Sequence, residues 1–591
     1  MNIKQLLTFS NCKLLINAVI TKGPAQTFYK LTSFFSSTNT YDDWQKKHTI
    51  SSSELNEETS TVFSYNPLIS ILVPAYHTKE RFIDELYDSL CKQSYSNWQL
   101  VIADANIDSP IHRKKLLDLA ATDKRILHIS LSSNLGISEN TNAALHEATG
   151  DYIGLLDHDD LLTPNALYEV VKAINLTSPE FIYSDEDSID DSTGLFLKPH
   201  FKPDFNIELL RANNYICHFS VIKKSLLNQV GEFRPAFNGA QDYDLFLRCC
   251  EKATLVYHIP KILYHWRSHT DSTASNPKSK MYAYEAGKHA LEEHLKRIGR
   301  NGIVNMTNNL GFYRIQYTIS ASPLISILIW DECDYKTTSH CIDNLRKHTS
   351  YTNYELIIAT ENAKNNHYRM FEQYNNISFI DINTITLKTP GAVYNHLSSF
   401  ASGKHMIILN NKVKPLNSTW IDELLMFSIQ PNIGAVGAKI LSKNNKIYHA
   451  GIMLGIGNNN IGYAHQGLSK KNPGYYNLAN LAQNITCVSA QCMMFQTQIF
   501  HKVGGFDVRY TNQLYDIDIC LKLQNANFSN IYTPYAEMET TLKLENPHKH
   551  KICENEEDLE YLTNTWGEIL SITDPFYNPN LSHEQADFLL Q

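Results

Sequence analysis

The chain has 591 residues, with 52 Lys and Arg against 61 Asp and Glu and a formal net charge of −9. A chain of this length exceeds one hydrophobic core and predicts about two to four folding units. Its slightly acidic balance gives no broad cationic surface, which disfavours a nucleic-acid partner. The 11 cysteines form no CxxC pair, so zinc and disulfide scaffolds lack support and a reducing, cytoplasmic setting is favoured.

The first 66 residues are an N-terminal extension that we expect to be partly helical. Polar residues such as Lys4 and Asn11 interrupt the apolar ones at its start, so we do not interpret it as a secretion signal. No apolar run reaches the roughly 18 residues that a membrane span needs. Residues 1–35 are amphipathic and basic, so they either lie on the inner face of a membrane or pack on the protein.

The rest of the sequence contains a long-period repeat. PLISILVPAY (67–76) recurs as PLISILIWDE (323–332), and YSNWQLVIADAN (95–106) recurs as YTNYELIIATEN (351–362), both at an offset of 256 residues. Later matches keep the same order, which indicates a duplicated domain rather than chance.

Each half has the pattern of an α/β domain. Short Ile/Leu/Val-rich runs alternate with longer helical stretches, which predicts buried parallel strands in an open, Rossmann-like sheet. In residues 80–93, Phe82, Leu86 and Leu90 fall on one face, as a helix packed on a sheet requires. We expect an N-terminal extension over 1–66, domains over 67–300 and 301–550, and a C-terminal tail over 551–591.

Acidic residues gather where strands of the first half are expected to end. Asp157, Asp159 and Asp160 directly follow a hydrophobic strand, and open α/β sheets bind ligands at the carboxyl ends of their strands. Such neighbouring carboxylates repel one another unless a cation or hydrogen-bond donors compensate. Mg²⁺ or Mn²⁺ is the simplest compensator, because it takes ligands from carboxylates, phosphate and water. The alternative is a solvated acidic turn.

The turn after the first strand, VPAYHTKERF, contains neither GxGxxG nor a lysine-bearing phosphate loop. This disfavours a dinucleotide-dependent oxidoreductase and a nucleotidyltransferase. Instead, the motifs of residues 67–275 resemble, in family order, those of the inverting glycosyltransferases of family 2, which have the GT-A fold. The motifs are PLISILVPAY, QLVIADANID, NLGISENTNAALHEATGDYI, GLLDHDD, NGAQDYDLFLR and LYHWRSHTDSTA.

This resemblance implies two tandem GT-A-like domains and a role for each matching residue. Asp104 would accept a hydrogen bond from the base of the nucleotide-sugar donor, with Pro74 and Tyr76 also at the donor. Asp157 would contact the ribose or the metal through water, and Asp159 would ligate the Mg²⁺ or Mn²⁺. The general base that takes the proton of the acceptor hydroxyl would be Asp242; Gln241 departs from the glutamate often found before it.

The last motif is expected to be a loop that closes over the donor. Either His265 or His269 would complete the metal shell, and Arg267 would contact the phosphates. Asp244 is expected to make structural hydrogen bonds in its helix. Asp185 and Glu186 lie where relatives bind the acceptor, with a simple acidic loop as the alternative.

The second half lacks the donor-site residues at the matching positions. Thr360, Asn410 and Lys412 stand where Asp104, Asp157 and Asp159 stand in the first half, and a lysine repels a divalent cation. Asp516 and Asp518 still match Asp242 and Asp244. We therefore interpret the second half as catalytically degenerate, with a metal-independent transferase that uses Lys412 as the alternative.

The function implied by the resemblance is transfer of a sugar, with inversion, from a UDP- or dTDP-sugar to a glycan or lipid-linked acceptor. Relatives with two such domains build bacterial surface polysaccharides such as O-antigen at the inner face of the membrane. Implied protein partners are a second copy of the chain or other polysaccharide-assembly enzymes. The alternatives are a non-catalytic glycan-binding or assembly subunit and a bifunctional transferase with an active second domain.

Overall fold

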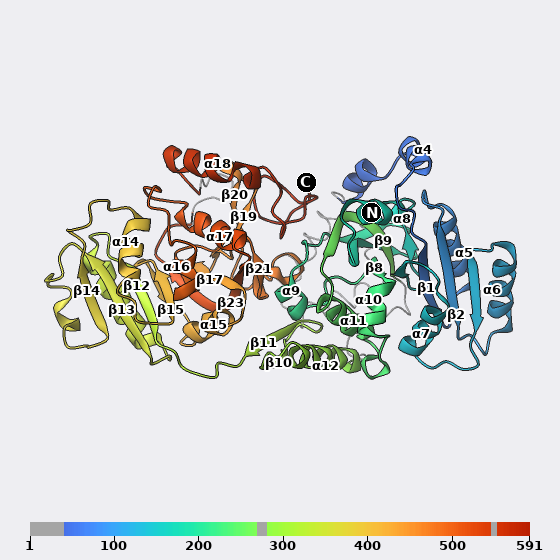
Figure 1. Ribbon diagram of the computed structural model, residues 1–591, viewed down its shortest axis with the longest axis horizontal. Coiled ribbons are helices and arrows are strands. Elements are labelled where there is room, and N and C mark those ends of the chain that lie inside the picture. The colour runs from blue at the N-terminus through green and yellow to red at the C-terminus, as the bar shows by residue number, and fades with distance from the viewer. Residues whose placement is uncertain (1–40, 269–280, 545–551) are drawn as a thin grey trace, which may run out of the picture.

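The computed structural model describes residues 41–268, 281–544 and 552–591 (Figure 1). The amphipathic segment over 1–35 and His269 lie outside these residues. Two α/β halves lie side by side along the longest axis of the molecule, and each contains one large mixed sheet. In the described residues, no helix is both long enough and apolar enough to cross a membrane.

The strands of the first half form a sheet in the order β3-β2-β1-β4-β8-β6-β9-β5, with β7 paired to β6. Strands β1, β2, β3 and β4 are mutually parallel, whereas β8 runs antiparallel to β4 and β6. The strands are β1 (Ile69–Ala75), β2 (Trp98–Asp104), β3 (Ile126–Ser130), β4 (Tyr152–Leu155), β5 (Leu161–Leu162), β6 (Phe181–Asp190), β7 (Phe196–His200), β8 (Ser220–Lys223) and β9 (Val256–Ser268).

Helices pack on this sheet or come before its first strand in the chain. The expected amphipathic helix is α5, which buries Phe82, Leu86 and Leu90, so that prediction is confirmed. The helices are α4 (Ser52–Ser60), α5 (Glu80–Cys91), α6 (Pro110–Thr122), α7 (Ile137–Glu147), α8 (Ala166–Thr177), α9 (Ile207–Ala212), α10 (Lys224–Val230), η1 (Pro235–Phe237), α11 (Gln241–Cys250) and α12 (Met281–Arg297).

The second sheet repeats the first strand for strand, in the order β14-β13-β12-β15-β22-β17-β23-β16. Strands β18 and β21 pair with β17 and β23, and β19 pairs with β20. The strands are β12 (Ile325–Trp330), β13 (Tyr354–Thr360), β14 (Ile377–Asp381), β15 (His405–Leu409), β16 (Val413–Pro415), β17 (Ile433–Ser442), β18 (Ile447–His449), β19 (Ile452–Leu454), β20 (Ile461–Tyr463), β21 (Gln483–Ile485), β22 (Cys492–Gln496) and β23 (Ser529–Thr540). The shared order confirms the α/β class and the duplicated architecture expected from the repeat.

A glycine stands at the equivalent position before β4 in the first half and before β15 in the second half. A Cβ on Gly150 would lie 2.7 Å from the carbonyl oxygen of Leu68, and a Cβ on Gly403 would lie 2.7 Å from that of Leu324. Only glycine lets these two strands approach the backbone that leads into β1 and β12.

The helices of the second half are α13 (Tyr335–His348), η4 (Arg369–Phe371), α14 (Pro390–Ser398), α15 (Trp420–Ser428), η5 (Asn458–Asn460), η6 (Tyr475–Asn480), α16 (Thr497–Lys502), α17 (Tyr515–Asn525) and α18 (Glu556–Leu570).

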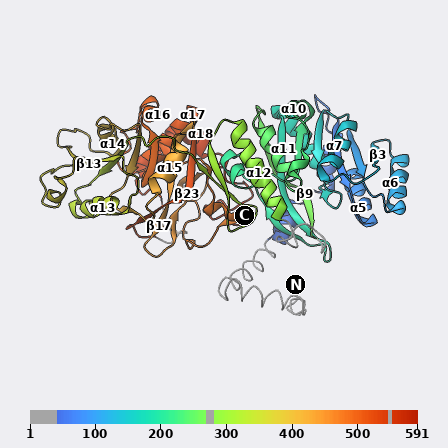
Figure 2. The same ribbon diagram turned by 90° about the horizontal axis from the view of Figure 1, so that it is seen from below.

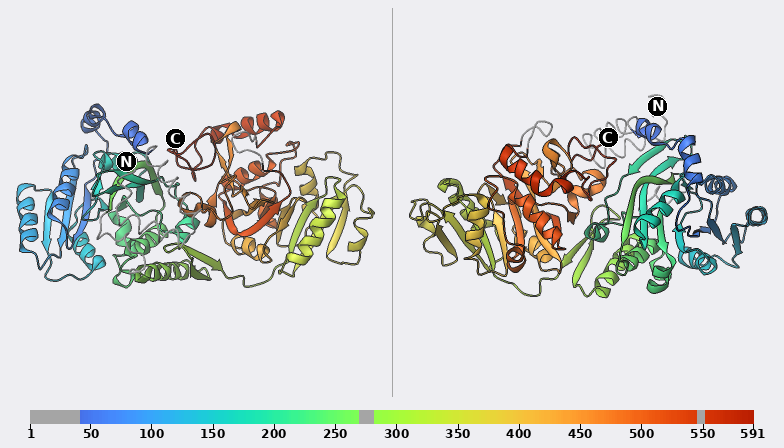
Figure 3. Two further views of the ribbon diagram at one scale, coloured as in Figure 1. Left: turned by 180° about the vertical axis from the view of Figure 1, so that it is seen from behind. Right: turned by 45° about the horizontal axis from the view of Figure 1, so that its top comes forward.

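The two halves meet along a broad junction. Helix α12 packs on α11, and Figure 2 shows the two helices side by side from below. Helix α12 leads into the hairpin of β10 (Gly302–Met306) and β11 (Tyr313–Tyr317), which is labelled in Figure 1. The C-terminal end of the chain lies between the halves in both views of Figure 3. Asn206 Nδ2 donates to the Asn484 carbonyl oxygen at 2.9 Å, and the Asn484 N–H donates to Asn206 Oδ1 at 2.9 Å. These buried bonds tie the halves together.

Candidate active site at the carboxyl edge of the first sheet

The ends of β1 and β2 form one side of the candidate donor site. Pro74 pairs with Ala103 in the sheet, and the exposed Tyr76 follows β1 directly. Asp104, the last residue of β2, is buried and accepts hydrogen bonds from Asn106 N–H at 2.9 Å and from His128 Nε2 at 2.9 Å. Burial opposes its charge, but these donors prevail and hold the pKa of Asp104 at about 2. The carboxylate is therefore ionised and fixed in orientation.

The acidic loop after β4 divides into two kinds of carboxylate. Asp157 and Asp159 are partly exposed, whereas Asp160 is buried. Asp160 accepts hydrogen bonds from the Arg267 N–H at 2.7 Å and from the Tyr264 hydroxyl. Burial raises the pKa of Asp160 well above its usual range, and the charges of Asp159 and Asp157 add to the rise. Protein donors thus hold Asp160, which anchors the loop to β9.

Asp242 lies in the first turn of α11, on the other side of the site. Its Oδ2 accepts a hydrogen bond from Asn214 Nδ2 at 2.9 Å. Burial raises its pKa, His218 and the Tyr243 N–H oppose the rise, and the charge of Asp157 adds to it. Asp242 therefore lies close enough to His218 and Asp157 for their charges to act on it, and His218 Nε2 itself lies 3.8 Å from Asp157 Oδ2. A carboxylate with a raised pKa is a better proton acceptor near neutral pH.

His218 is a site residue that the sequence reasoning missed. Its Nε2 lies 3.8 Å from Asp157 Oδ2, and its ring stacks on Tyr264 with centroids 4.5 Å apart. It precedes β8, which runs antiparallel to β4, and Ser220 pairs with Leu155. The amino end of β8 therefore reaches the same edge as the carboxyl end of β4. His218 could have been predicted only from the antiparallel direction of β8. The local sequence HFSVIKK does not show in which direction that strand runs.

The structure corrects the expected loop around His265 and Arg267. Strand β9 continues through Ser268 and pairs with β6, so both residues belong to a strand. His265 Nδ1 lies 2.6 Å from Asp187 Oδ1. Arg267 is buried, and its guanidinium contacts the Asp159 carbonyl oxygen and the carboxylates of Glu85 and Asp191. Their expected roles at the metal and the phosphates stay predictions.

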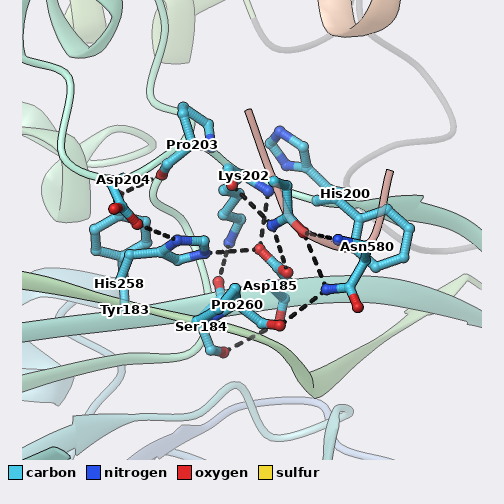
Figure 4. A network of polar contacts seen from close by, with 12 residues as sticks. Tyr183, Ser184, Asp185, His200, Lys202, Pro203, Asp204, His258, Pro260 and Asn580 are labelled. Carbon is cyan, nitrogen blue, oxygen red and sulfur yellow. Dashed lines mark hydrogen bonds and ion pairs between the residues drawn. The ribbon is translucent and has the colours of Figure 1, made fainter. Parts of the chain in front are cut away.

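The remaining carboxylates of this edge are held by protein groups. Asp244 is buried and bonded to Arg234 and Arg248, which confirms its expected structural role. Asp185 accepts hydrogen bonds from the Lys202 N–H and from His258 Nε2, both at 2.8 Å. Figure 4 shows that this network includes a residue of the C-terminal tail, Asn580, whose Nδ2 donates to the Pro260 carbonyl oxygen.

The donor set of the acidic loop fits a divalent cation of the Mg²⁺ or Mn²⁺ kind. Such ions take one or two protein carboxylates and complete their shell with phosphate and water. Asp157 and Asp159 are partly exposed oxygen donors on one loop. Within the residues that the structure describes, no three or more His, Cys, Asp or Glu side chains are grouped so that they could hold a metal ion. An open site that needs substrate oxygens agrees with both observations.

The matching edge of the second half has a different chemistry. Lys412 Nζ lies 3.0 Å from Glu332 Oε2, so an ion pair occupies the position of the acidic loop. Asp516 Oδ2 accepts a hydrogen bond from the Ala490 N–H at 3.0 Å, and Oδ1 accepts one from the Ile517 N–H. Asp518 pairs with Lys522 at 2.7 Å and accepts a bond from Trp566 Nε1. These contacts are those of helix-start structure.

Comparison with known proteins places the first half in a family. Residues 70–231 match the family model described as Glycosyl transferase family 2. Over 182 residues, 30% of this chain and 68% of the relative, the chain is 31% identical to the Escherichia coli UDP-Glc:alpha-D-GlcNAc-diphosphoundecaprenol beta-1,3-glucosyltransferase WfgD. The chain belongs to glycosyl transferase family 2. This confirms the family resemblance, although the matched residues of the family model end before Asp242.

The second half of this family 2 chain is also shared by relatives. The chain is 29% identical to the O-antigen biosynthesis protein RfbC of Myxococcus xanthus, over 90% of its own length and 42% of that protein. It spans about half the length of the curated relatives that it matches over most of its own length. Among solved structures it is similar to the mannosyltransferase PcManGT from Pyrobaculum calidifontis, described in complex with GDP-Man and Mn²⁺; the TM-score is 0.32 at 11% identity, over 51% of this chain and 78% of that one.

Proposed function

We propose that the first half transfers a sugar from a nucleotide-diphosphate donor to a hydroxyl of a glycan or lipid-linked glycan, with inversion. The observation that carries the proposal is the meeting of Asp157 and Asp242, through His218, at the carboxyl edge of a family 2 sheet. The donor would lie along Asp104 and the acidic loop, and the acceptor would approach from the side of Asp242. The names of the relatives WfgD and RfbC support a UDP-sugar donor and a place in O-antigen synthesis.

Asp242 supplies the base in this proposal. The acceptor oxygen attacks the anomeric carbon as the bond from that carbon to the diphosphate oxygen breaks, and the nucleoside diphosphate leaves. The hydroxyl proton passes to Asp242, whose pKa is raised by burial and by the charge of Asp157. Because a single displacement occurs from the face opposite the leaving group, the configuration of the anomeric carbon inverts.

Asp159, with Asp157 beside it, would hold the divalent cation. The cation neutralises the charge that develops on the leaving diphosphate. Asp160 keeps this loop in place through the Arg267 N–H and the Tyr264 hydroxyl. His218, which is stacked on Tyr264 and lies 3.8 Å from Asp157, would help to position that carboxylate.

The second half is proposed to be non-catalytic. Its ion pair between Lys412 and Glu332 replaces the cation-binding carboxylates. Asp516, at the position of the base, is engaged by backbone N–H groups of Ala490 and Ile517. Burial raises the pKa of Asp516 even though these donors oppose the rise, as it does for Asp242, so the proposal rests on the lost cation-binding carboxylates and not on the acidity of Asp516.

A donor panel tests the proposal. The full chain is incubated with UDP- and dTDP-sugars and Mn²⁺, and release of the nucleoside diphosphate is measured with and without a glycan acceptor. We expect release from at least one donor, and loss of that release when Asp159 is changed to Asn. Release from no donor would favour the alternative, a non-catalytic glycan-binding or assembly subunit.

A further inference from the structure

A loop of the second half lies against the strand ends of the first. Tyr475, at the start of η6, accepts a hydrogen bond from the Phe201 N–H at 2.8 Å. The Tyr476 hydroxyl donates to the Lys198 carbonyl oxygen at 3.1 Å. These partners belong to β7 and the residues that follow it, so two tyrosines of the second half form hydrogen bonds with the backbone of the first half.

Tyr476 is held as a flat, accessible ring. It stacks on His200 with centroids 3.9 Å apart and an interplanar angle of 14°, yet 41% of the residue is exposed. Its φ of 41° lies in the left-handed region, which is strained for a bulky side chain. Such strain persists only where the surroundings enforce it, and it is concentrated at functional sites.

A short chain of contacts connects Tyr476 to the candidate active site. His200, beneath its ring, lies 3.3 Å from Glu186 through Nδ1 and Oε1, and Glu186 Oε2 accepts a hydrogen bond from the His218 N–H at 3.1 Å. His218 in turn lies 3.8 Å from Asp157. Cys217, next to His218, donates through Sγ to the Asn214 carbonyl oxygen at 3.0 Å, and Asn214 Nδ2 donates to Asp242 at 2.9 Å. The base therefore lies near the same segment.

A second exposed ring adjoins this segment from the first half. Trp266 on β9 is 40% exposed, and its ring centroid lies 5.9 Å from that of His218. Isolated exposed aromatic residues are common and need no explanation. Here, however, the two rings come from different halves and contact the same series of residues: Tyr476 contacts His200 and Trp266 contacts His218. Flat rings with a polar edge suit a ligand that has both apolar faces and hydroxyl groups.

The junction between the halves holds this loop rigidly. Asn578 Nδ2 donates to Asp185 Oδ2 at 2.8 Å and to the Lys202 carbonyl oxygen at 2.9 Å, beside the network of Figure 4. Both bonds are buried and cross from the C-terminal tail to β6 and the residues after β7, and Phe588 of the same tail stacks on Tyr475 of the loop with ring centroids 6.0 Å apart. A ring fixed in this way loses little conformational entropy when a ligand stacks on it.

We propose that the second half completes the acceptor subsite of the first, with the exposed face of Tyr476 stacking on a sugar ring of the acceptor glycan and Trp266 bordering the same subsite. The inference rests on the proposed function, because it takes the ligand on the Asp242 side to be the acceptor. It gives the degenerate half a direct part in substrate binding.

The test measures glycan binding by the full chain. Octyl glycosides of glucose, N-acetylglucosamine and rhamnose are titrated, and binding is followed by saturation-transfer NMR. We expect Tyr476→Ala and Tyr476→Leu to weaken binding about tenfold, because both remove the flat ring. Leu retains apolar packing on His200, so it separates loss of the ring from loss of folding. Tyr476→Phe keeps the ring and should bind within about twofold of the unsubstituted chain.

Tyr65 provides a matched control, since it is also an exposed tyrosine but precedes β1 at the amino ends of the parallel strands. Tyr65→Ala should bind the glycosides as the unsubstituted chain does. The inference would be overturned if Tyr476→Ala and Tyr476→Leu bound the glycosides as tightly as the unsubstituted chain, or if the unsubstituted chain bound no glycoside. Titration with UDP and dTDP separates this outcome from failure of the proposed function: a chain that binds neither nucleotide contradicts the donor site, whatever happens at Tyr476.

Discussion

Replacing Asp242 by Asn should abolish turnover without destabilising the fold. A positioned general base contributes about 10²–10⁴ in rate, which corresponds to roughly 3–5 kcal/mol of activation free energy. The amide has the shape of the carboxylate, and its oxygen can still accept the hydrogen bond that Asn214 Nδ2 donates at 2.9 Å. We therefore expect kcat to fall by at least about a hundredfold, while the affinity for the nucleotide is retained because Asp104 and Asp159 are untouched.

The effect on stability has a definite sign. The folded state raises the pKa of Asp242, so the ionised group opposes folding at any pH above both its folded and its unfolded pKa, and this cost disappears as the pH falls below them. At neutral pH, Asp242→Asn removes the cost, and the melting temperature should stay the same or rise. Loss of activity together with an unchanged or higher melting temperature is a signature of chemistry rather than folding.

The assay compares Asp242→Asn with Asp118→Asn, which changes an exposed aspartate on α6. Nucleotide release, nucleotide affinity by calorimetry and thermal melting are measured for each protein. The base assignment fails if Asp242→Asn keeps a third or more of the turnover. It also fails if the melting temperature falls together with activity, because the loss would then be structural.

Four further predictions concern the pH dependence of turnover, the metal, the second half and a buried lysine of the first half. Turnover should decline on the acid side at a pH above the ordinary value of about 4 for aspartate, because Asp242 must be ionised and its pKa is raised; a pH profile that stays flat down to that value contradicts this. EDTA should abolish nucleotide release and Mg²⁺ or Mn²⁺ should restore it; release that is undiminished in chelator removes the metal from the scheme. Calorimetry with UDP or dTDP and Mn²⁺ should give one nucleotide per full chain, because Lys412 pairs with Glu332; two per chain would mean an active second half. Lys202→Met should lower the free energy of unfolding by about 3 kcal/mol, because the buried Nζ donates to the carbonyl oxygens of Ser184, Ile216 and His218; an unchanged urea midpoint contradicts this.

The fold was predictable because its signals are local and repeated. The apolar face of α5 and the buried run of β1 follow from spacing within a few residues. The repeat supplied the second sheet from the first, including Gly150 and Gly403. By contrast, the extension of β9 through Ser268 depends on its pairing with β6, which begins at Phe181, and that pairing leaves no mark in the local pattern.

The site was predictable only where a motif carried it. Asp157, Asp159 and Asp242 belong to recognisable sequence motifs, whereas His218 reaches the site because β8 reverses direction. Tyr476 could not be found from the sequence, since its partner Lys198 is 278 positions away. Contacts of this kind are set by how the two sheets dock, and docking depends on buried polar groups such as Asn206 and Asn484 that resemble ordinary surface residues in a sequence.

The carboxylates of the first site fall into two groups that differ in burial and in function. Asp160 and Glu186 are buried and bonded to protein donors, so their hydrogen bonds fix the positions of loops, and leaving those bonds unmade would be costly.

Asp157, Asp159 and Asp242 are partly exposed, so their oxygens can reach a cation or a substrate without unfolding the edge of the sheet. In the second half the corresponding exposed positions carry Asn410, Lys412 and Asp516, and Lys412 is neutralised from within the protein. Because a divalent cation requires more than one oxygen donor, changing Lys412 alone back to aspartate would leave Glu332 without its cation and would not rebuild the site. The ion pair of Lys412 and Glu332 therefore occupies the position at which the first half presents Asp159, which supports the proposal that the second half is non-catalytic and contributes to the acceptor subsite of the first.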